Sequence, residues 1–304
     1  MFSRFLEELD RKSIRISYNS GKLTFEGPEE NVTPDIIEKL RKHKANLIKY
    51  HWPAECINMM PINPLGNKIP FILVYFEVMN YPLSDFLGKD QPFYGFLHVG
   101  SHGEKIMYDN VESYAADYVR QLQKIVPNGP YFLGGFSFGG VVAFEMAVQL
   151  QKNGYDVPFL ALLDSSIGVP PVPMVWHKNL YKIIRSNILG PFRRRSKDWI
   201  NLQLCRMCVL LKKPIPLSLR NLYIVSKYEE LTNKYKPGRY KGDILLFRSD
   251  SAHPDYKYNG WELYADNIHV VPFSGGHLTI AREKEYARII GTEFLTHLAR
   301  VTRE

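Results

Sequence analysis

Residues 135–140 constrain this chain more than any other segment, because they carry a G-x-S-x-G motif in a specific setting. The apolar run at 130–133 predicts a buried strand before the motif, and the pattern at 141–147 predicts a helix after it. Glycines on both sides of Ser137 permit a strained strand-to-helix turn that lifts the hydroxyl above the sheet edge. We therefore predict that Ser137 is a nucleophile; the alternative is a glycine-rich turn whose serine only caps a helix.

Composition indicates a globular protein, since 45% of the 304 residues are hydrophobic and 23% are charged. The first ten residues carry acidic side chains where a signal peptide needs an apolar core, and no uncharged apolar run approaches the roughly 18 residues that span a bilayer. The three cysteines, Cys56, Cys205 and Cys208, are too sparse for a disulfide framework and too few for a zinc site. We expect a monomeric cytoplasmic protein that binds neither a metal nor a membrane.

Strand and helix patterns alternate from about residue 65 to the end of the chain. The expected strands cover 68–76, 91–97, 130–133, 157–164, 242–247 and 268–273, and the expected helices cover 110–125, 141–147 and 281–300. Helices between apolar strands indicate a mostly parallel sheet with both faces covered. We predict an α/β-hydrolase fold for residues 65–304, preceded by a proline-rich linker at 53–64.

A serine nucleophile needs an adjacent base and a group that orients this base, because its hydroxyl is protonated at neutral pH. In α/β-hydrolases the acid and then the histidine follow the serine along the chain. His277 follows a Ser-Gly-Gly turn directly after the last expected strand, so we predict that it is the general base. Two carboxylates end strands and compete as the acid, namely Asp164 and Asp250.

The segment at about 165–237 is an insertion above the nucleophile, which predicts a lid. Its sequence indicates helices at 176–188, 199–211 and 217–235. The segment carries 14 lysines and arginines against 3 acidic residues, although the net charge of the whole chain is only +8. Such a basic surface either is solvated or meets an acidic partner.

Residues 1–52 predict a separate αββα unit. Phe5 and Leu9 recur at helical spacing, two alternating segments around a turn at 19–21 indicate a β-hairpin, and Thr33-Pro34 opens a second helix. A hairpin in so small a unit exposes an edge strand, and an edge strand can bind a further peptide strand.

The segment 5–49 resembles the tubulysin-type N-terminal docking domain of non-ribosomal peptide synthetases, on its Lys-Ser-Ile-Arg-Ile strand and its Thr-Pro-Asp-Ile-Ile helix. In that family the hairpin captures a short C-terminal tail of the upstream enzyme. The resemblance therefore implies an upstream synthetase as partner, with Arg15, Lys22 and the strand 22–26 as contacts. The alternative is a helical cap packed on the next domain, with basic residues that are only solvated.

Residues 63–300 resemble, in size and in the order of their elements, the terminal thioesterases of peptide synthetases. In these enzymes a Leu-Leu-Asp after the earlier strand supplies the acid, which residues 162–164 match, so the resemblance favours Asp164 over Asp250. It implies that Ser137 takes an acyl chain from the phosphopantetheine of a carrier protein, without a bound cofactor. No Gly-Gly-x-Ser carrier motif precedes the domain, so this carrier is expected on another polypeptide.

The same resemblance implies further contacts. The oxyanion is expected to bind the N–H groups of Phe138 and Val78, although residues 75–80 lack the His-Pro and glycines of many relatives. We expect the Glu77 carboxylate, which would oppose an oxyanion, to face solvent. Candidate contacts to the carrier and its phosphate lie in the lid: Arg193, Arg194, Arg195 and Lys197.

Other classes of function explain less of the sequence. A nucleic-acid binder would account for the basic lid but not for Ser137, Asp164 and His277, and a non-catalytic adaptor would account for residues 1–50 alone. Within the enzymes, an editing thioesterase that strips misprimed carriers is the alternative, but such proteins usually lack a docking domain. We predict a chain-releasing thioesterase that acts in trans, with release by hydrolysis or by cyclisation.

Overall fold

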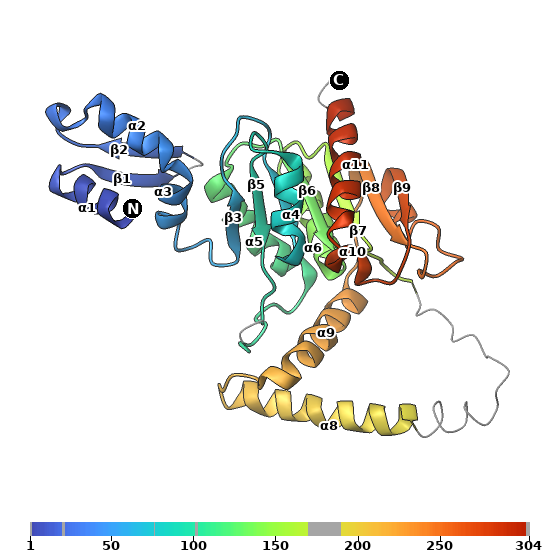
Figure 1. The fold of residues 1–304 in the computed structure, drawn as a ribbon. Coiled ribbons are helices and arrows are strands. Elements are labelled where there is room, and N and C mark those ends of the chain that lie inside the picture. The colour runs from blue at the N-terminus through green and yellow to red at the C-terminus, as the bar shows by residue number, and fades with distance from the viewer. Residues whose placement is uncertain (1, 20–21, 76, 101–102, 170–189, 302–304) are drawn as a thin grey trace.

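A seven-stranded sheet in the order β3-β5-β4-β6-β7-β8-β9 forms the centre of the computed structural model (Figure 1). All neighbouring strands are parallel except the edge pair of β3 and β5. The α/β-hydrolase prediction of a mostly parallel central sheet is therefore confirmed. The strands are β3 (Met59–Asn63), β4 (Phe71–Val74), β5 (Phe93–Phe96), β6 (Phe132–Phe136), β7 (Phe159–Leu163), β8 (Tyr240–Ser249) and β9 (Ala265–Phe273).

The structure describes residues 2–19, 22–75, 77–100, 103–169 and 190–301, apart from the side chains of 3, 19, 77, 78, 190–196 and 301. The helix expected at 176–188 lies outside these residues. No helix in the described ranges combines the length and the hydropathy needed to cross a membrane.

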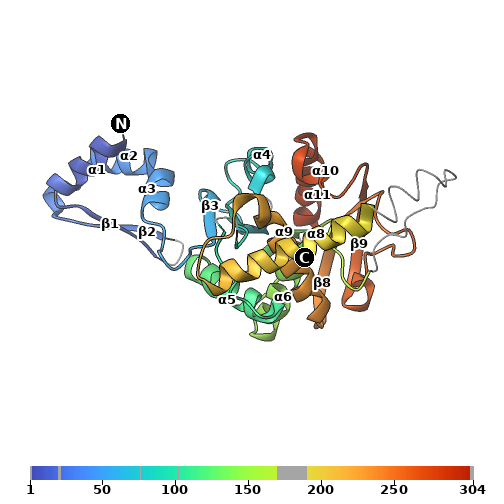
Figure 2. The ribbon, with the colours of Figure 1, turned by 90° about the horizontal axis from the view of Figure 1, so that it is seen from below.

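Helices cover both faces of the sheet, as Figure 2 shows from below. One face carries α5 (Val111–Ile125) and α6 (Phe138–Lys152), and the other carries α4 (Glu77–Leu87), α10 (Thr279–Arg282) and α11 (Glu285–Val301). Alternate residues of each strand enter the two cores: Ile72 packs toward α5 and α6, and Leu73 packs toward α4 and α11. This arrangement explains why the strands are apolar on both faces.

Two expectations about chain boundaries are wrong. The linker expected at 53–64 contains β3, which pairs antiparallel with β5 at the sheet edge. Proline does not exclude an edge strand, because one side of such a strand needs no ladder N–H, and the register shifts between Pro61 and Asn63. The closing helix expected at 281–300 is two helices, since the backbone at Glu283 is extended with φ −92° and ψ 115°.

The first fifty residues form the predicted αββα unit, with the second helix broken at His43. Thr33 caps that helix, because its hydroxyl oxygen accepts a hydrogen bond from the Ile36 N–H at 3.4 Å. A small apolar core that includes Phe5, Ile14 and Ile36 holds the unit together. Its elements are α1 (Phe2–Arg11), β1 (Arg15–Asn19), β2 (Lys22–Glu26), α2 (Pro34–Lys42) and α3 (Lys44–Tyr50).

Trp52 joins this unit to the sheet. Its ring stacks on Tyr18 of β1 at 5.7 Å and on Tyr94 of β5 at 5.9 Å between centroids. Its indole N–H donates a hydrogen bond to the Met59 carbonyl at 2.9 Å. The N-terminal unit is thus packed against the edge of the sheet, while the domain boundary at residue 52 stays a prediction.

Two further helices extend beyond the sheet (Figure 1): α8 (Gly190–Leu210) and α9 (Leu217–Lys234). They correspond to the second and third helices expected in the lid. Cys205 is fully buried in this region, with its Sγ 4.0 Å from the Leu219 carbonyl oxygen, and burial raises its thiol pKa. This environment fits packing of the cysteine between the two helices.

We predict that Trp52→Ala loosens the junction between the N-terminal unit and the sheet. The substitution removes two ring contacts and the hydrogen bonds of the indole N–H to the Cys56 and Met59 carbonyls, so we expect a loss of about 2 kcal/mol in the free energy of unfolding. Hydrogen exchange should become faster in β1 and β3. The control is Tyr50→Ala, since Tyr50 is exposed and its ring contacts Phe2 and His51 instead of Tyr18 and Tyr94. Unchanged exchange in Trp52→Ala would contradict this prediction.

Candidate active site

The backbone at Ser137 has φ 55° and ψ −124°, a left-handed conformation that costs energy for any residue with a side chain. This turn joins β6 to α6 and is held by a hydrogen bond from the Ser137 N–H to the Leu163 carbonyl at 3.0 Å. Glycines are required around it, because a Cβ on Gly135 would lie 2.1 Å from the Gly139 carbonyl oxygen. A Cβ on Gly139 would lie 2.4 Å from the Val74 carbonyl oxygen. The G-x-S-x-G motif is thus a packing requirement of this turn.

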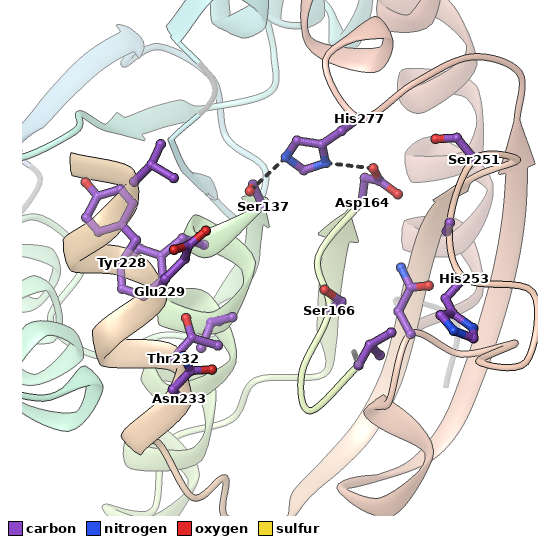
Figure 3. A pocket seen from close by; sticks show the side chains of 16 residues that line it. Ser137, Asp164, Ser166, Tyr228, Glu229, Thr232, Asn233, Ser251, His253 and His277 are labelled. Atoms are coloured by element: carbon purple, nitrogen blue, oxygen red, sulfur yellow. Dashed lines mark hydrogen bonds and ion pairs between the residues drawn. The ribbon is translucent and has the colours of Figure 1, made fainter. Parts of the chain in front are cut away.

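Ser137, His277 and Asp164 form one hydrogen-bonded series (Figure 3). Nε2 of His277 lies 2.9 Å from Oγ of Ser137, and Nδ1 of His277 lies 2.7 Å from Oδ2 of Asp164. With the imidazole proton on Nδ1, the histidine donates to the carboxylate and accepts from the serine hydroxyl. In this arrangement the imidazole can remove the serine proton, and the carboxylate can stabilise the resulting imidazolium.

The Asp164 carboxylate is fixed and almost buried, with 7% of its side chain exposed. Its Oδ1 accepts a hydrogen bond from the Ser249 N–H at 3.0 Å, and its own N–H donates to the Phe247 carbonyl at 2.8 Å. Both partners belong to β8, the strand next to β7. The His277 ring stacks on Phe136, with 4.8 Å between centroids. Each member of the series is therefore positioned by a strand end or by a core ring.

Asp250, the other candidate for the acid, has a different set of partners. Its Oδ2 accepts from the Ser274 hydroxyl at 2.9 Å, and its Oδ1 accepts from the Gly275 N–H at 3.1 Å. The Tyr286 hydroxyl donates to the Ser274 carbonyl at 2.6 Å from the other side. Asp250 thus holds the turn that carries His277, whereas Asp164 contacts the imidazole itself.

The two predicted oxyanion donors lie at the starts of helices that follow the neighbouring strands β6 and β4. Phe138 is the first residue of α6 and Val78 is the second residue of α4, and N–H groups in the first turn of a helix have no partner within it. Both helices start at the same edge of the sheet, after β6 and β4, and the helix dipoles favour negative charge there. The expected orientation of the Glu77 side chain lies outside the described residues.

A cavity of about 470 Å³ opens beside Ser137 and His277. One wall is the α9 face formed by Val225, Tyr228, Glu229, Thr232 and Asn233, which repeat at helical spacing. Sequence reasoning did not predict these residues, although their spacing within the expected lid helix was a usable signal. The remaining lining residues are Phe138, Val141, Asp164, Ser166, Val169, Ser251, Ala252, His253 and Asn259.

Three tyrosines attach α9 to the rest of the domain. The Tyr228 ring stacks on the ring of Phe138, the residue that follows Ser137, with 4.1 Å between centroids. The Tyr235 hydroxyl donates to the buried Glu145 carboxylate at 2.6 Å, and burial raises the pKa of this carboxyl group. The Tyr223 hydroxyl accepts from the Ile106 N–H at 3.1 Å. The cavity wall is therefore a firmly attached helix.

The predicted partner contacts are far from this cavity or only partly described. Lys197 is exposed on α8, while the side chains of Arg193, Arg194 and Arg195 lie outside the described residues. Arg15 on β1 and Lys22 on β2 are both exposed. Arg15 also lines a groove of about 530 Å³ together with Leu6, Glu7, Leu9, Asp10, Ile14, Ile16, Tyr50 and His51.

Within the described ranges, no group of histidine, cysteine, aspartate and glutamate side chains is arranged to hold a metal ion.

Comparisons with known sequences assign both parts of the chain. Residues 81–194 match the family model of the thioesterase domain, and residues 3–51 match that of the TubC N-terminal docking domain. Malpibaldin synthetase of Mortierella alpina is 38% identical over 207 residues, which are 65% of this chain and 3% of that protein. A dimodular nonribosomal peptide synthase of Bacillus subtilis is 26% identical over 257 residues, which are 76% of this chain and 10% of that protein. The chain thus spans a small part of these relatives.

Comparisons with solved structures concern the fold. The NocB thioesterase domain from the nocardicin cluster is 22% identical with a TM-score of 0.57, over 80% of this chain and 99% of that domain. The thioesterase domain SrfTE is 20% identical with a TM-score of 0.52, over 81% of this chain and 98% of that domain. Sequence and fold agree: the chain combines a TubC-type N-terminal docking domain with a thioesterase domain of the α/β-hydrolase type.

Proposed function

We propose that this protein releases an acyl or peptidyl chain from the phosphopantetheine thioester of a carrier protein. The observation that carries the proposal is the series Ser137–His277–Asp164, which borders a cavity and two helix N-termini. The relatives are synthetases, which supports a carrier-bound thioester as the substrate.

In the first step, Oγ of Ser137 attacks the thioester carbonyl while Nε2 of His277 takes the hydroxyl proton. The negative charge that develops on the carbonyl oxygen is stabilised by the N–H groups of Phe138 and Val78. The carbon–sulfur bond then breaks, and the imidazolium returns its proton to the departing phosphopantetheine thiol. An ester of Ser137 with the acyl chain remains.

In the second step, water or a hydroxyl or amine of the acyl chain attacks this ester, and His277 takes the attacking group's proton. The bond to Oγ breaks and the serine regains its proton, which completes hydrolysis or cyclisation with the same three residues. SrfTE, with the same fold, is described as cyclising a lipopeptide. The choice depends on how well the cavity excludes water from the ester.

The docking domain favours a dedicated partner over general editing of carriers. We propose that the C-terminal tail of an upstream synthetase lies in the groove beside β1, where the apolar side chains of Leu6 and Ile16 line the wall and Arg15 supplies a charge. Lys22 and the strand 22–26 form the opposite edge of the hairpin and offer a second contact. Lys197 and the neighbouring arginines of α8 would meet the acidic carrier and its phosphate.

The nucleophile is tested with a fluorophosphonate, a reagent class for which a covalent complex of NocB is known. We expect one adduct on Ser137 of the wild-type protein and none on Ser137→Ala, measured by peptide mass spectrometry. Equal labelling of the wild type and Ser137→Ala would rule out the proposed reaction.

Asp164→Asn should lower kcat for a small thioester by about 10⁴-fold, because the imidazole then loses its carboxylate partner.

Asp250 should contribute to activity through the position of His277. Asp250→Ala removes two hydrogen bonds to the turn, and we expect kcat/KM for a small thioester to fall about ten- to a hundredfold. Asp250→Asn, which retains an acceptor oxygen for Gly275, should recover part of this loss. A loss in Asp250→Ala as large as that in Asp164→Asn would instead make Asp250 the acid.

Arg15→Glu should weaken docking without changing the chemistry. With a carrier on an upstream synthetase that ends in its own C-terminal tail, we expect KM to rise about fivefold, since a charge contact becomes repulsive. Hydrolysis of a small free thioester should be unchanged. Arg41→Glu on α2 is the matched control, because Arg41 is exposed and outside the groove. Equal KM values for the two variants would argue against docking at this groove.

A further inference from the structure

Glu229 places a carboxylate in the wall of the catalytic cavity. It lies on α9 between Tyr228 and Thr232, and Figure 3 shows these side chains on the side of the cavity opposite His253. Residues 229, 232 and 233 are neighbours on one helix face, so the oxygens of Glu229, Thr232 and Asn233 gather within one turn. This turn offers acceptors to whatever part of a substrate enters the cavity.

No other described residue neutralises Glu229. The adjacent Glu230 forms ion pairs with Lys227 at 3.3 Å and with Lys234 at 2.6 Å. Glu229 has no hydrogen bond or ion pair among the described residues, and it is exposed in the wall of the cavity. The two lysines of α9, Lys227 and Lys234, thus pair with Glu230 and do not neutralise Glu229.

His253, which lies across the cavity, does not compensate Glu229 either. His253 is buried, and its partners belong to Asp255: its Nδ1 lies 3.3 Å from the Asp255 backbone nitrogen and 3.8 Å from the Asp255 carboxylate. The wall therefore carries a net negative charge. This contrasts with the segment 165–237 as a whole, in which lysines and arginines outnumber acidic residues by 14 to 3.

We propose that Glu229, Thr232 and Asn233 form a subsite for a cationic group of the acyl chain, such as an amino group. The inference rests on the proposed function, since it concerns the chain that Ser137 carries. An acyl chain in the cavity displaces the water around Glu229, and an unpaired carboxylate without water is costly. An ammonium group offers three N–H donors, which matches a carboxylate flanked by two neutral acceptors.

The subsite is held in place before a substrate arrives. Tyr228, next to Glu229 in the chain, stacks on Phe138, and Tyr235 anchors the end of the helix to Glu145. Because α9 is attached at both places, binding a cation needs little ordering of the wall. Glu229 is therefore suited to select substrates by charge.

The test compares three thioesters of N-acetylcysteamine that differ in one side chain: Nα-acetyl-lysyl, Nα-acetyl-norleucyl and Nα-acetyl-2-aminoadipyl. For the full-length wild-type protein we expect kcat/KM to be at least about tenfold higher for the lysyl than for the norleucyl thioester, and lowest for the acidic one. In Glu229→Gln the ratio of lysyl to norleucyl should fall by about tenfold. In the control Glu262→Gln, which removes an exposed carboxylate outside the cavity, the ratio should stay at the wild-type value.

Each result decides between the two proposals. A wild-type protein without a preference for the lysyl thioester, or an equal fall of the ratio in Glu229→Gln and Glu262→Gln, would overturn the cationic subsite while the thioesterase reaction stands. Failure of the wild type to cleave any of the three thioesters would overturn both. Because the ratio is measured within one protein preparation, partial unfolding of a variant does not change it.

Discussion

The left-handed turn at Ser137 is the constraint on which the rest of the site depends. Its backbone is unfavourable for a serine, so β7, β4 and α6 must enclose it closely, and the contacts of Gly135 and Gly139 show how little space remains. The same turn raises the hydroxyl at the edge where β7 and β9 end, which brings Asp164 and His277 within hydrogen-bond reach. It also starts α6 directly after the nucleophile, so a helix N-terminus faces the reacting group.

The attachment of α9 converts this general site into a specific one. Tyr228 packs on the residue that follows the nucleophile, and Tyr235 bonds to a carboxylate in the middle of the sheet-covering helix α6. The position of α9 is therefore fixed relative to Ser137, and the side chains between these two contacts form one wall of the cavity. Basic residues form the majority of the charged residues in the segment 165–237, whereas the carboxylate of Glu229 lies on the side that faces the cavity.

The sequence predicted what local chemistry dictates. Short segments were enough to predict the turn at Ser137 with its glycines, the Ser-Gly-Gly turn before His277 and the apolar strands. The resemblance to terminal thioesterases favoured Asp164 over Asp250 as the acid. The sequence did not predict β3, because this proline-containing segment becomes a strand by pairing with the edge of β5. The α9 wall was missed for a related reason: helical spacing gives a face, but only the packed tyrosines decide what that face meets.

The central claim is that Ser137 carries the chain between its carrier and its acceptor. The most direct measurement is intact-protein and peptide mass spectrometry of the protein quenched within milliseconds to seconds of mixing with a loaded carrier. The account predicts a transient mass increase equal to the acyl chain, located on the peptide that contains Ser137. Loss of the thioester at the same rate with no acyl group on that peptide, or with the group on another residue, would contradict it.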